Sequence, residues 1–468
     1  MATTNGTAPW TGEQPTAILH RTPVRPPVAT AATGIYVTLE DGSTIIDAVG
    51  GAAVACIGNG HPAVLKAMKD QIDQMCYIYN FQLTSVPAEE LAQHIIKASD
   101  SAFELVGFVS GGSEAMEGVI KTARQYYFEL GQTQRIKFIA RKLSFHGNTV
   151  ATLALAHHPT RRVPYAPLLD SDNYHHVSPA YAARFQTKGE SEEEYVARLA
   201  KELDDKFQEL GPDTVIGFVC ETVVGATTGV VPPPKGYLKA MKDICDKYGA
   251  LFMLDEVMSG MGRLGTLHAW QTHGDDARPD IQAVAKGLGG GYVSIGAVLV
   301  SPRVAAPLVA AGGWKHGHTY QAHPIACAAA LAVQRTVVDE DLLARVRTWG
   351  PRMGARLEAA LRGPNARAAP FTHDVRGAGA WWGVEFDFEN DAARAKGYEG
   401  KAFAMDVQAR ALENGLIIMG FTGGASLDGA MGNHCMLSPA YNVTEEEIER
   451  IVDLFVKSVE EVLAANGL

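Results

Sequence analysis

Short apolar runs alternate with longer amphipathic stretches through the middle of the chain. After each run comes a loop, and then a segment whose apolar residues recur at the spacing of a helix. This alternation is typical of parallel strands connected by helices, so it predicts an α/β fold with a doubly wound, mainly parallel sheet flanked by helices. The expected strands are 105–109, 136–140, 215–220, 251–254, 281–285 and 295–300, and the expected helices include 192–210 and 235–248.

The two ends of the chain follow other patterns. Residues 1–33 are rich in Thr, Ala and Pro, which predicts an irregular arm, whereas 34–47 alternates around Asp41-Gly42 as a β-hairpin does. Beyond Pro324 we expect helices at 325–338, 341–361 and 445–465 and strands near 381–388 and 416–419. The expected organisation is an arm (1–33), a large domain (76–324) and a small α+β domain built from both ends (34–75 and 325–468).

Composition narrows the classes of function. The 468 residues carry a formal net charge of -11, which argues against a nucleic-acid partner because phosphate backbones need clustered positive charge. No apolar run is long enough to span a bilayer, and no secretory signal is visible. The six cysteines show no CxxC pair, so neither a disulfide framework nor a metal site is expected. These features favour a cytoplasmic enzyme.

Three ionisable residues, Glu221, Asp255 and Lys286, each follow an apolar run. The carboxyl ends of parallel strands meet at one edge of a sheet, so we expect the three side chains to converge there. A lysine removed from water has a lowered pKa and can form a Schiff base, and a carboxylate beside it can hold the protonated ring nitrogen of pyridoxal phosphate. Taken singly, Lys286 could also be a surface residue of a turn, and Asp255 a structural partner of Arg263.

A phosphate-binding turn is expected at Gly112 and Ser113, where an apolar strand passes into a helix. Backbone N–H groups at a helix N-terminus and a hydroxyl form an anion site, although the same residues could simply cap the helix. Phe145 and His146, after the next strand, could place an aromatic ring against a planar cofactor. A core phenylalanine beside a loop histidine is the alternative for that pair.

Several motifs occur together in a characteristic order and spacing: Gly112-Ser113-Glu114-Ala115, Phe145-His146-Gly147, Asp255-Glu256-Val257, Gly260-Met261-Gly262-Arg263, Ala285-Lys286-Gly287 and the segment 316–324. In these motifs the chain resembles the class III pyridoxal-phosphate aminotransferases, in particular their ω-transaminase branch, over about residues 30–465. The resemblance implies the fold type I architecture of pyridoxal-phosphate enzymes. It also implies a homodimer with shared active sites, and it leaves open whether dimers pair into tetramers.

The resemblance further implies that a defined set of residues contacts pyridoxal phosphate: Gly112, Ser113, Phe145, His146, Glu221, Asp255, Val257, Lys286 and Thr319. Among them Lys286 would form the Schiff base and move the proton, and Asp255 would hold the ring nitrogen. Phe145 and Val257 would pack on opposite faces of the ring, and Thr319 would reach the phosphate bound by the other subunit. The catalytic residues are therefore expected to be Lys286 and Asp255.

The implied activity is transfer of an amino group from a primary amine to a 2-oxo acid such as pyruvate, in a ping-pong cycle through pyridoxamine phosphate. One alternative is an ω-amino-acid aminotransferase acting on ornithine, 4-aminobutyrate or β-alanine. Another is a racemase or decarboxylase that uses the same cofactor. A dimeric scaffold without activity is the non-enzymatic alternative, and the retained Lys286, Asp255 and Thr319 argue against it.

Two stretches depart from the family pattern. Relatives that use pyruvate often bind its carboxylate with an arginine in the C-terminal loop, but 417–441 contains none, which leaves Arg162 and His434 as candidates and Arg376 as a structural residue. The proline expected after the glutamate is Thr222.

The substrate wall is also unusual, because small residues occupy 47–53, where several ω-transaminases have a tryptophan. We therefore expect a roomy, apolar pocket for a bulky or long-chain amine. The expected substrate contacts are Ala53, Tyr77, Tyr79, Phe81, Phe145 and His434, with the aromatic residues of 77–81 contributed across the dimer interface.

Overall fold

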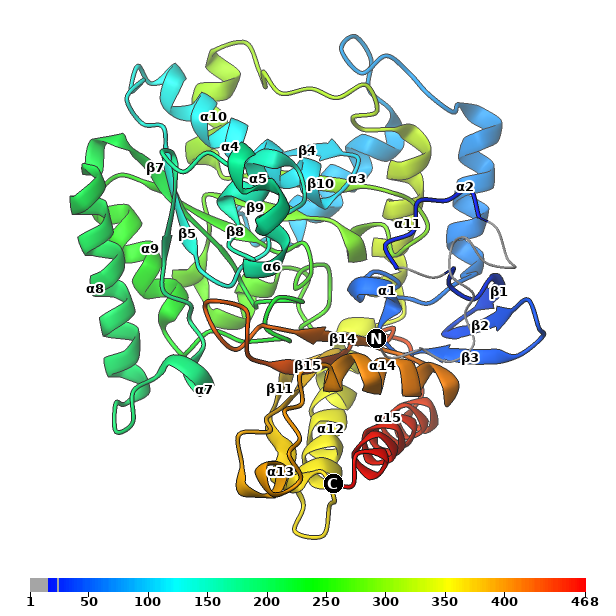
Figure 1. Cartoon of the computed structure of the whole chain (residues 1–468). Coiled ribbons are helices and arrows are strands. Elements are labelled where there is room, and N and C mark those ends of the chain that lie inside the picture. The colour runs from blue at the N-terminus through cyan, green and yellow to red at the C-terminus, as the bar shows by residue number, and fades with distance from the viewer. Residues whose placement is uncertain (1–15, 23–24) are drawn as a thin grey trace.

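The computed structural model describes residues 16–22 and 25–468 of the chain. Its centre is a seven-stranded sheet with the order β4-β10-β9-β8-β7-β5-β6 (Figure 1). Neighbouring strands run parallel except around β10, which is antiparallel to both β4 and β9. The strands are β4 (Leu105–Val109), β5 (Lys137–Arg141), β6 (Tyr174–Val177), β7 (Val215–Glu221), β8 (Leu251–Asp255), β9 (Ile281–Val284) and β10 (Gly296–Val300).

Helices cover both faces of this sheet, which explains why its strands are almost wholly apolar. Within β8, Phe252 and Leu254 belong to the core on one face, and Leu251 and Met253 belong to the core on the other. The first core contains residues of α3 (Val86–Lys97), α8 (Glu192–Leu210), α9 (Tyr237–Lys247) and α11 (Pro324–Asp339). The second contains residues of α4 (Gly112–Glu129), α5 (Val150–Leu155) and α10 (Pro302–Ala310).

Two smaller sheets lie below the central one in Figure 1. The first has the order β11-β12-β15-β14 and comprises β11 (Thr372–Ala378), β12 (Trp381–Phe386), β15 (Asn433–Leu437) and β14 (Met419–Thr422). The second has the order β1-β2-β3-β13 and comprises β1 (Ala29–Thr33), β2 (Tyr36–Leu39), β3 (Thr44–Asp47) and β13 (Leu416–Ile417). Because β13 pairs with β3, segments from the two ends of the chain share one sheet.

The remaining helices complete these layers. Two of them, α12 and α15, pack against one another beside the small sheets. No helix in the described ranges combines the length and the apolarity that crossing a bilayer requires. The remaining helices are α1 (Gly50–Ala53), α2 (Pro62–Gln74), α6 (Pro159–Arg162), α7 (Ala182–Phe185), α12 (Leu342–Arg362), α13 (Asp391–Ala395), α14 (Phe403–Glu413) and α15 (Glu445–Ala465).

Two of the expected segments take a different form in the structure. Ala29–Thr33, expected to belong to an irregular arm, forms β1 because it pairs with the first strand of the 34–47 hairpin. The rest of the expected arm falls partly outside the described residues. The single strand expected near 416–419 is instead two strands, β13 and β14, in two different sheets, because the chain changes partner at Ile418. The expected domain boundaries stay a prediction.

Arg376 belongs to a buried ionic cluster that joins the small sheets to the rest of the molecule. It donates to Glu385 at 2.6 Å and to the carbonyl of Gly229 at 2.9 Å, and Arg184 and Tyr181 also donate to the Glu385 carboxylate. A buried carboxylate needs such partners to offset its lost hydration. Arg376 is therefore held by contacts within the fold.

Candidate active site

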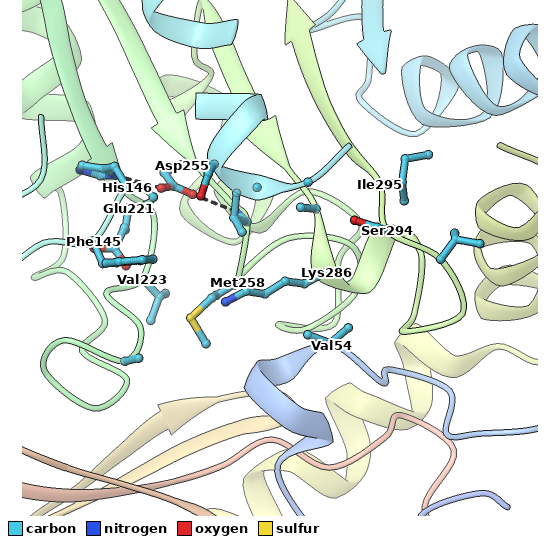
Figure 2. Close-up of a pocket in the computed structure, with 18 residues that line it drawn as sticks. Val54, Phe145, His146, Glu221, Val223, Asp255, Met258, Lys286, Ser294 and Ile295 are labelled. Carbon is cyan, nitrogen blue, oxygen red and sulfur yellow. Dashed lines mark hydrogen bonds and ion pairs between the residues drawn. The ribbon is translucent and has the colours of Figure 1, made fainter. Parts of the chain in front are cut away.

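The carboxyl ends of β7, β8 and β9 bring Glu221, Asp255 and Lys286 to one edge of the central sheet. Glu221 is the direct register partner of Asp255, and Lys286 comes two residues after the end of β9. A cavity of about 300 Å³ opens at this edge, and Figure 2 shows the three side chains on its walls. All but one of the residues expected to bind cofactor line it: Gly112, Ser113, Phe145, His146, Glu221, Asp255, Val257 and Lys286.

Lys286 occupies a turn that holds its side chain within the cavity. Removal from bulk water lowers the pKa of Lys286 to about 8, although the negative charges of Asp255 and Glu221 oppose the shift. The backbone has a φ of +44°, which is costly for a residue with a side chain and is typical of functional positions. Gln334 stabilises the turn by donating to the carbonyls of Gly287 and Leu288 at 2.8 and 3.0 Å.

Asp255 is a buried carboxylate held from two sides. Its Oδ2 lies 2.9 Å from Nδ1 of His146, and its Oδ1 accepts a hydrogen bond from the backbone of Val257 at 3.0 Å. The side chain of Asp255 is only 5% exposed and that of His146 is 0% exposed. These two contacts hold the carboxylate in one orientation at the cavity wall.

Another part of the cavity lining, at the start of α4, is suited to an anion. Helix α4 begins at Gly112, so its unpaired N–H groups and the positive end of its dipole are directed to this part. A Cβ atom added to Gly112 would lie 2.9 Å from Cγ1 of Val257, so only glycine fits there. Ser113 accepts a hydrogen bond from the backbone of Asn148 at 3.1 Å and can donate its own hydroxyl proton to an anion.

A buried amine, a fixed carboxylate and an anion cradle around one cavity are the features needed to hold a phosphorylated aldehyde such as pyridoxal phosphate. The family model for class III aminotransferases matches residues 20–459 of this sequence. The chain belongs to the class III aminotransferases. It therefore uses pyridoxal phosphate, has the fold type I architecture and catalyses an aminotransferase reaction.

Individual relatives agree with this assignment. An uncharacterised aminotransferase of Schizosaccharomyces pombe is 40% identical, with 94% of both chains covered. A gamma-aminobutyrate transaminase of Oryza sativa is 31% identical over 96% of this chain and 84% of its own. Among solved structures, the omega transaminase of Pseudomonas jessenii in complex with PMP is 29% identical, with a TM-score of 0.84 and 94% of both chains covered.

Glu221 of this aminotransferase has a positioning contact that the sequence did not reveal. Its Oε1 accepts from the backbone N–H of Phe145 at 3.1 Å, and its Oε2 accepts from that of Gly225 at 2.9 Å. Burial raises the pKa of Glu221, and the charge of His146 opposes this rise. One carboxylate therefore ties two loops of the cavity wall together. The residue after it, Thr222, donates to the buried Glu256 at 2.8 Å, which a proline could not do.

Thr319 and the aromatic residues of 77–81 lie outside the cavity of a single chain. The hydroxyl of Tyr77 donates to the backbone carbonyl of Thr319 at 2.9 Å, and Tyr79 and Phe81 are 57% and 84% exposed. A second depression that includes Tyr320 shares three residues, 293–295, with the cavity. The segment around Thr319 therefore lies on an open face beside the active site.

Two other expected substrate residues are placed behind the cavity wall. Ala53 is buried and its carbonyl accepts from Arg263 at 3.3 Å, whereas the neighbouring Val54 lines the cavity. His434 is buried and its Nε2 contacts the carbonyl of Ala226 at 3.2 Å, so it supports the wall from behind. The sequence also missed other lining residues, most of which come from loops without a periodic pattern. They are Val223, Ala226, Met258, Val293, Ser294 and Ile295.

The lowered pKa of Lys286 leads to a prediction for cofactor uptake. Because the neutral amine is the form that attacks an aldehyde, the rate at which the cofactor-free protein binds pyridoxal phosphate is expected to rise with pH and to level off above about pH 8. The measurement is the growth of the cofactor's absorbance band in stopped-flow mixing across pH 6 to 10. Free Nα-acetyl-lysine is the control, and its rate of reaction with pyridoxal phosphate should keep rising until the pH reaches the ordinary pKa of a lysine side chain. A protein rate that also keeps rising to pH 10 contradicts the prediction.

Proposed function

We propose that this aminotransferase transfers the amino group of a bulky or long-chain apolar primary amine to a 2-oxo acid such as pyruvate. The observation that carries the proposal is the apolar wall that faces Lys286. Val54, Val223 and Met258 line the cavity on this side (Figure 2). An alkyl or aryl substituent gains free energy by leaving water for such a wall, whereas a charged substituent loses its hydration there.

Each residue of the site has a separate role in the proposed reaction. Pyridoxal phosphate, when bound, supplies an electron sink that makes a proton on the carbon beside its nitrogen acidic. In our assignment Asp255 keeps the ring nitrogen protonated, with His146 and Val257 fixing its orientation. The ε-amino group of Lys286 would accept the proton from the donor carbon and pass it to the cofactor carbon C4′, and the half-reaction with the 2-oxo acid would run this proton transfer in reverse. The start of α4, at Gly112 and Ser113, holds the phosphate.

We further propose that the active site is completed by a second copy of the chain. The support is the exposed aromatic face beside the cavity, where Phe81 is 84% exposed and Tyr320 is 61% exposed. Large apolar side chains gathered on an open surface are typical of an interface. Thr319 and the aromatic residues Tyr77 and Tyr79 would then contribute to the partner's site, with Thr319 reaching its phosphate.

An ω-amino-acid aminotransferase is the second candidate, favoured by the similarity to the gamma-aminobutyrate transaminase of Oryza sativa. Butylamine and 4-aminobutyrate separate the two, because they differ mainly in a distal carboxylate. Both are mixed with cofactor-loaded protein, and loss of the visible cofactor band reports the first half-reaction. We expect butylamine to react about tenfold faster or more, since the side chains of Val54, Val223 and Met258 offer the distal carboxylate no hydrogen-bond donor. A faster reaction with 4-aminobutyrate would favour the second candidate.

Dependence on a 2-oxo acid completes the test. After the amine has bleached the band, addition of pyruvate is expected to restore it and to yield alanine in equal amount. A racemase or decarboxylase on the same fold would turn over without pyruvate. Sustained turnover of an amine in the absence of any 2-oxo acid would therefore contradict the proposed function.

A further inference from the structure

The C-terminal loop lacks an arginine, but a neighbouring element supplies one close to the cavity. Arg161 lies on the short helix α6, and its guanidinium carbon is 4.7 Å from the centroid of the Phe145 ring. Phe145 itself lines the cavity. A guanidinium over an aromatic face is held in a defined orientation by cation–π attraction and stacking. The guanidinium of Arg161 therefore lies directly against a side chain of the cavity wall.

Arg161 has no carboxylate partner within the described residues, in contrast to the paired Arg184 and Arg376. Burial lowers the pKa of Arg161, and the positive charge of Arg21 lowers it further. A guanidinium still carries its charge under these conditions. Arg161 is partly removed from water, and within the described ranges no carboxylate neutralises Arg161 or Arg21. The two cations therefore produce a positive potential that an anion would offset.

The charge of Arg161 also acts on the reacting amine. It is among the positive charges that lower the pKa of Lys286, and its contribution exceeds that of Arg263. By contrast, the charge of Arg162 lowers the pKa of His157 and of His176. The two adjacent arginines therefore have different electrostatic neighbours, and the charge of Arg161 acts on Lys286.

The histidines near this part of the cavity cannot replace Arg161 as a cation. Burial lowers the pKa of His434 to about 4, and the pKa of His158 is lowered to about 4 for the same reason. Both are thus neutral at neutral pH. His434 also directs Nε2 to the backbone carbonyl of Ala226. The sequence-based candidates Arg162 and His434 are therefore less suited to bind a carboxylate than Arg161.

The arginine-free loop and α6 form one continuous wall. A Cβ atom added to Gly429 would lie 2.9 Å from Cβ of Pro159, so the backbone of the loop packs directly against the helix that bears Arg161. A cation on α6 can thus supply the charge that the loop 417–441 does not.

We propose that Arg161 binds the carboxylate of the 2-oxo acid acceptor and, in the reverse direction, that of an α-amino-acid donor. The planar fork of the guanidinium can donate two parallel N–H···O bonds to the carboxylate, which fixes the orientation of the keto carbon beside Lys286. Phe145 holds the fork in place. This assignment rests on the proposed function, because it names the part of the same site that receives the acceptor.

The test compares Arg161→Gln with Arg162→Gln, a change of the same kind at the adjacent position, in the cofactor-loaded full-length protein. For Arg161→Gln we expect the concentration of pyruvate, and of racemic alanine, that half-saturates the reaction to rise about 10- to 100-fold, as is usual when a charge-assisted pair is lost. Bleaching by sec-butylamine, which has no carboxylate, is expected to change less than about threefold. Arg162→Gln should match the wild type in all three reactions, and Arg161→Lys should recover part of the loss.

The outcomes separate this inference from the proposed function. If the wild type reacts with sec-butylamine and pyruvate but Arg161→Gln leaves the pyruvate and alanine constants unchanged, the role of Arg161 is refuted and the function stands. Equal losses for sec-butylamine and alanine would also refute it, because a damaged cavity affects every substrate. If the wild type reacts with alanine and pyruvate but not with sec-butylamine, the proposed amine donor is wrong, and the alanine and pyruvate constants of Arg161→Gln still decide the role of Arg161.

Discussion

Replacing Lys286 with alanine is expected to abolish transamination, with a fall in kcat of about 10⁴-fold or more. The side chain is the amine at the carboxyl edge of the sheet whose pKa is lowered to about 8, and it lines the same cavity as the carboxylates of Glu221 and Asp255. Alanine removes both the nucleophile that holds the cofactor and the base that moves the proton. Neighbouring side chains cannot substitute, since those carboxylates are fixed by their own hydrogen bonds.

Turnover with an amine and pyruvate measures the loss, and borohydride reduction provides an independent reading. Treatment of the loaded wild type should attach the cofactor irreversibly to the peptide that contains position 286, as seen by mass spectrometry, and the variant should show no attachment. Lys239→Ala is a suitable control, because that lysine forms an exposed pair with Asp243. If Lys286→Ala kept substantial turnover, or if the label appeared on another lysine, the assignment of this residue would be wrong.

The second large effect is expected for Asp255→Asn, which should lower kcat by about 10³-fold. The amide has almost the same shape as the carboxylate, so the contacts with His146 and Val257 can largely persist. What disappears is the negative charge that would keep the ring nitrogen protonated. The cofactor should still bind, but the ring should withdraw electrons far less effectively.

A second buried aspartate provides a matched control for this change. Asp280 precedes β9, at the opposite end of the strands, where it accepts from the backbone of Phe252 at 2.9 Å and pairs with Arg303 at 3.3 Å. Asp280→Asn should lower the midpoint of thermal unfolding and leave kcat within about threefold, because it weakens a structural pair far from the reaction. If Asp255→Asn behaved in the same way as Asp280→Asn, Asp255 would be structural.

The sequence predicted the central part of the site because its position depends on simple local patterns. Apolar runs buried on both faces read clearly as parallel strands, and their carboxyl ends meet at one edge, which places Glu221, Asp255 and Lys286 together. The bounds of α8 and α15 also agree with expectation. Both helices begin at a capping box, formed by Ser191 with Glu194 in α8 and by Thr444 with Glu447 in α15.

The parts that the sequence did not predict depend on contacts between distant segments. The sequence of the glycine-rich turn before Val54 does not determine which of its side chains faces the cavity. In the structure Ala53 has a positive φ, and Val54 lines the cavity. Arg161 comes from a helix of only four residues, too short for periodicity to show its direction. Thr319 lies on an open face beside the cavity, and in our proposal that face is completed by a second copy of the chain, which one subunit does not display.

The bridge that Glu221 makes has a consequence for attempts to enlarge the cavity. The loop containing Gly225 and Ala226 is the natural place to create room for larger substrates, since Ala226 lines the wall. Yet the same carboxylate that anchors this loop also anchors Phe145, on which Arg161 is stacked. A change in the loop of Gly225 and Ala226 would thus also shift Phe145 and Arg161. Variants with a wider cavity would therefore accept larger amines but lose selectivity for the acceptor.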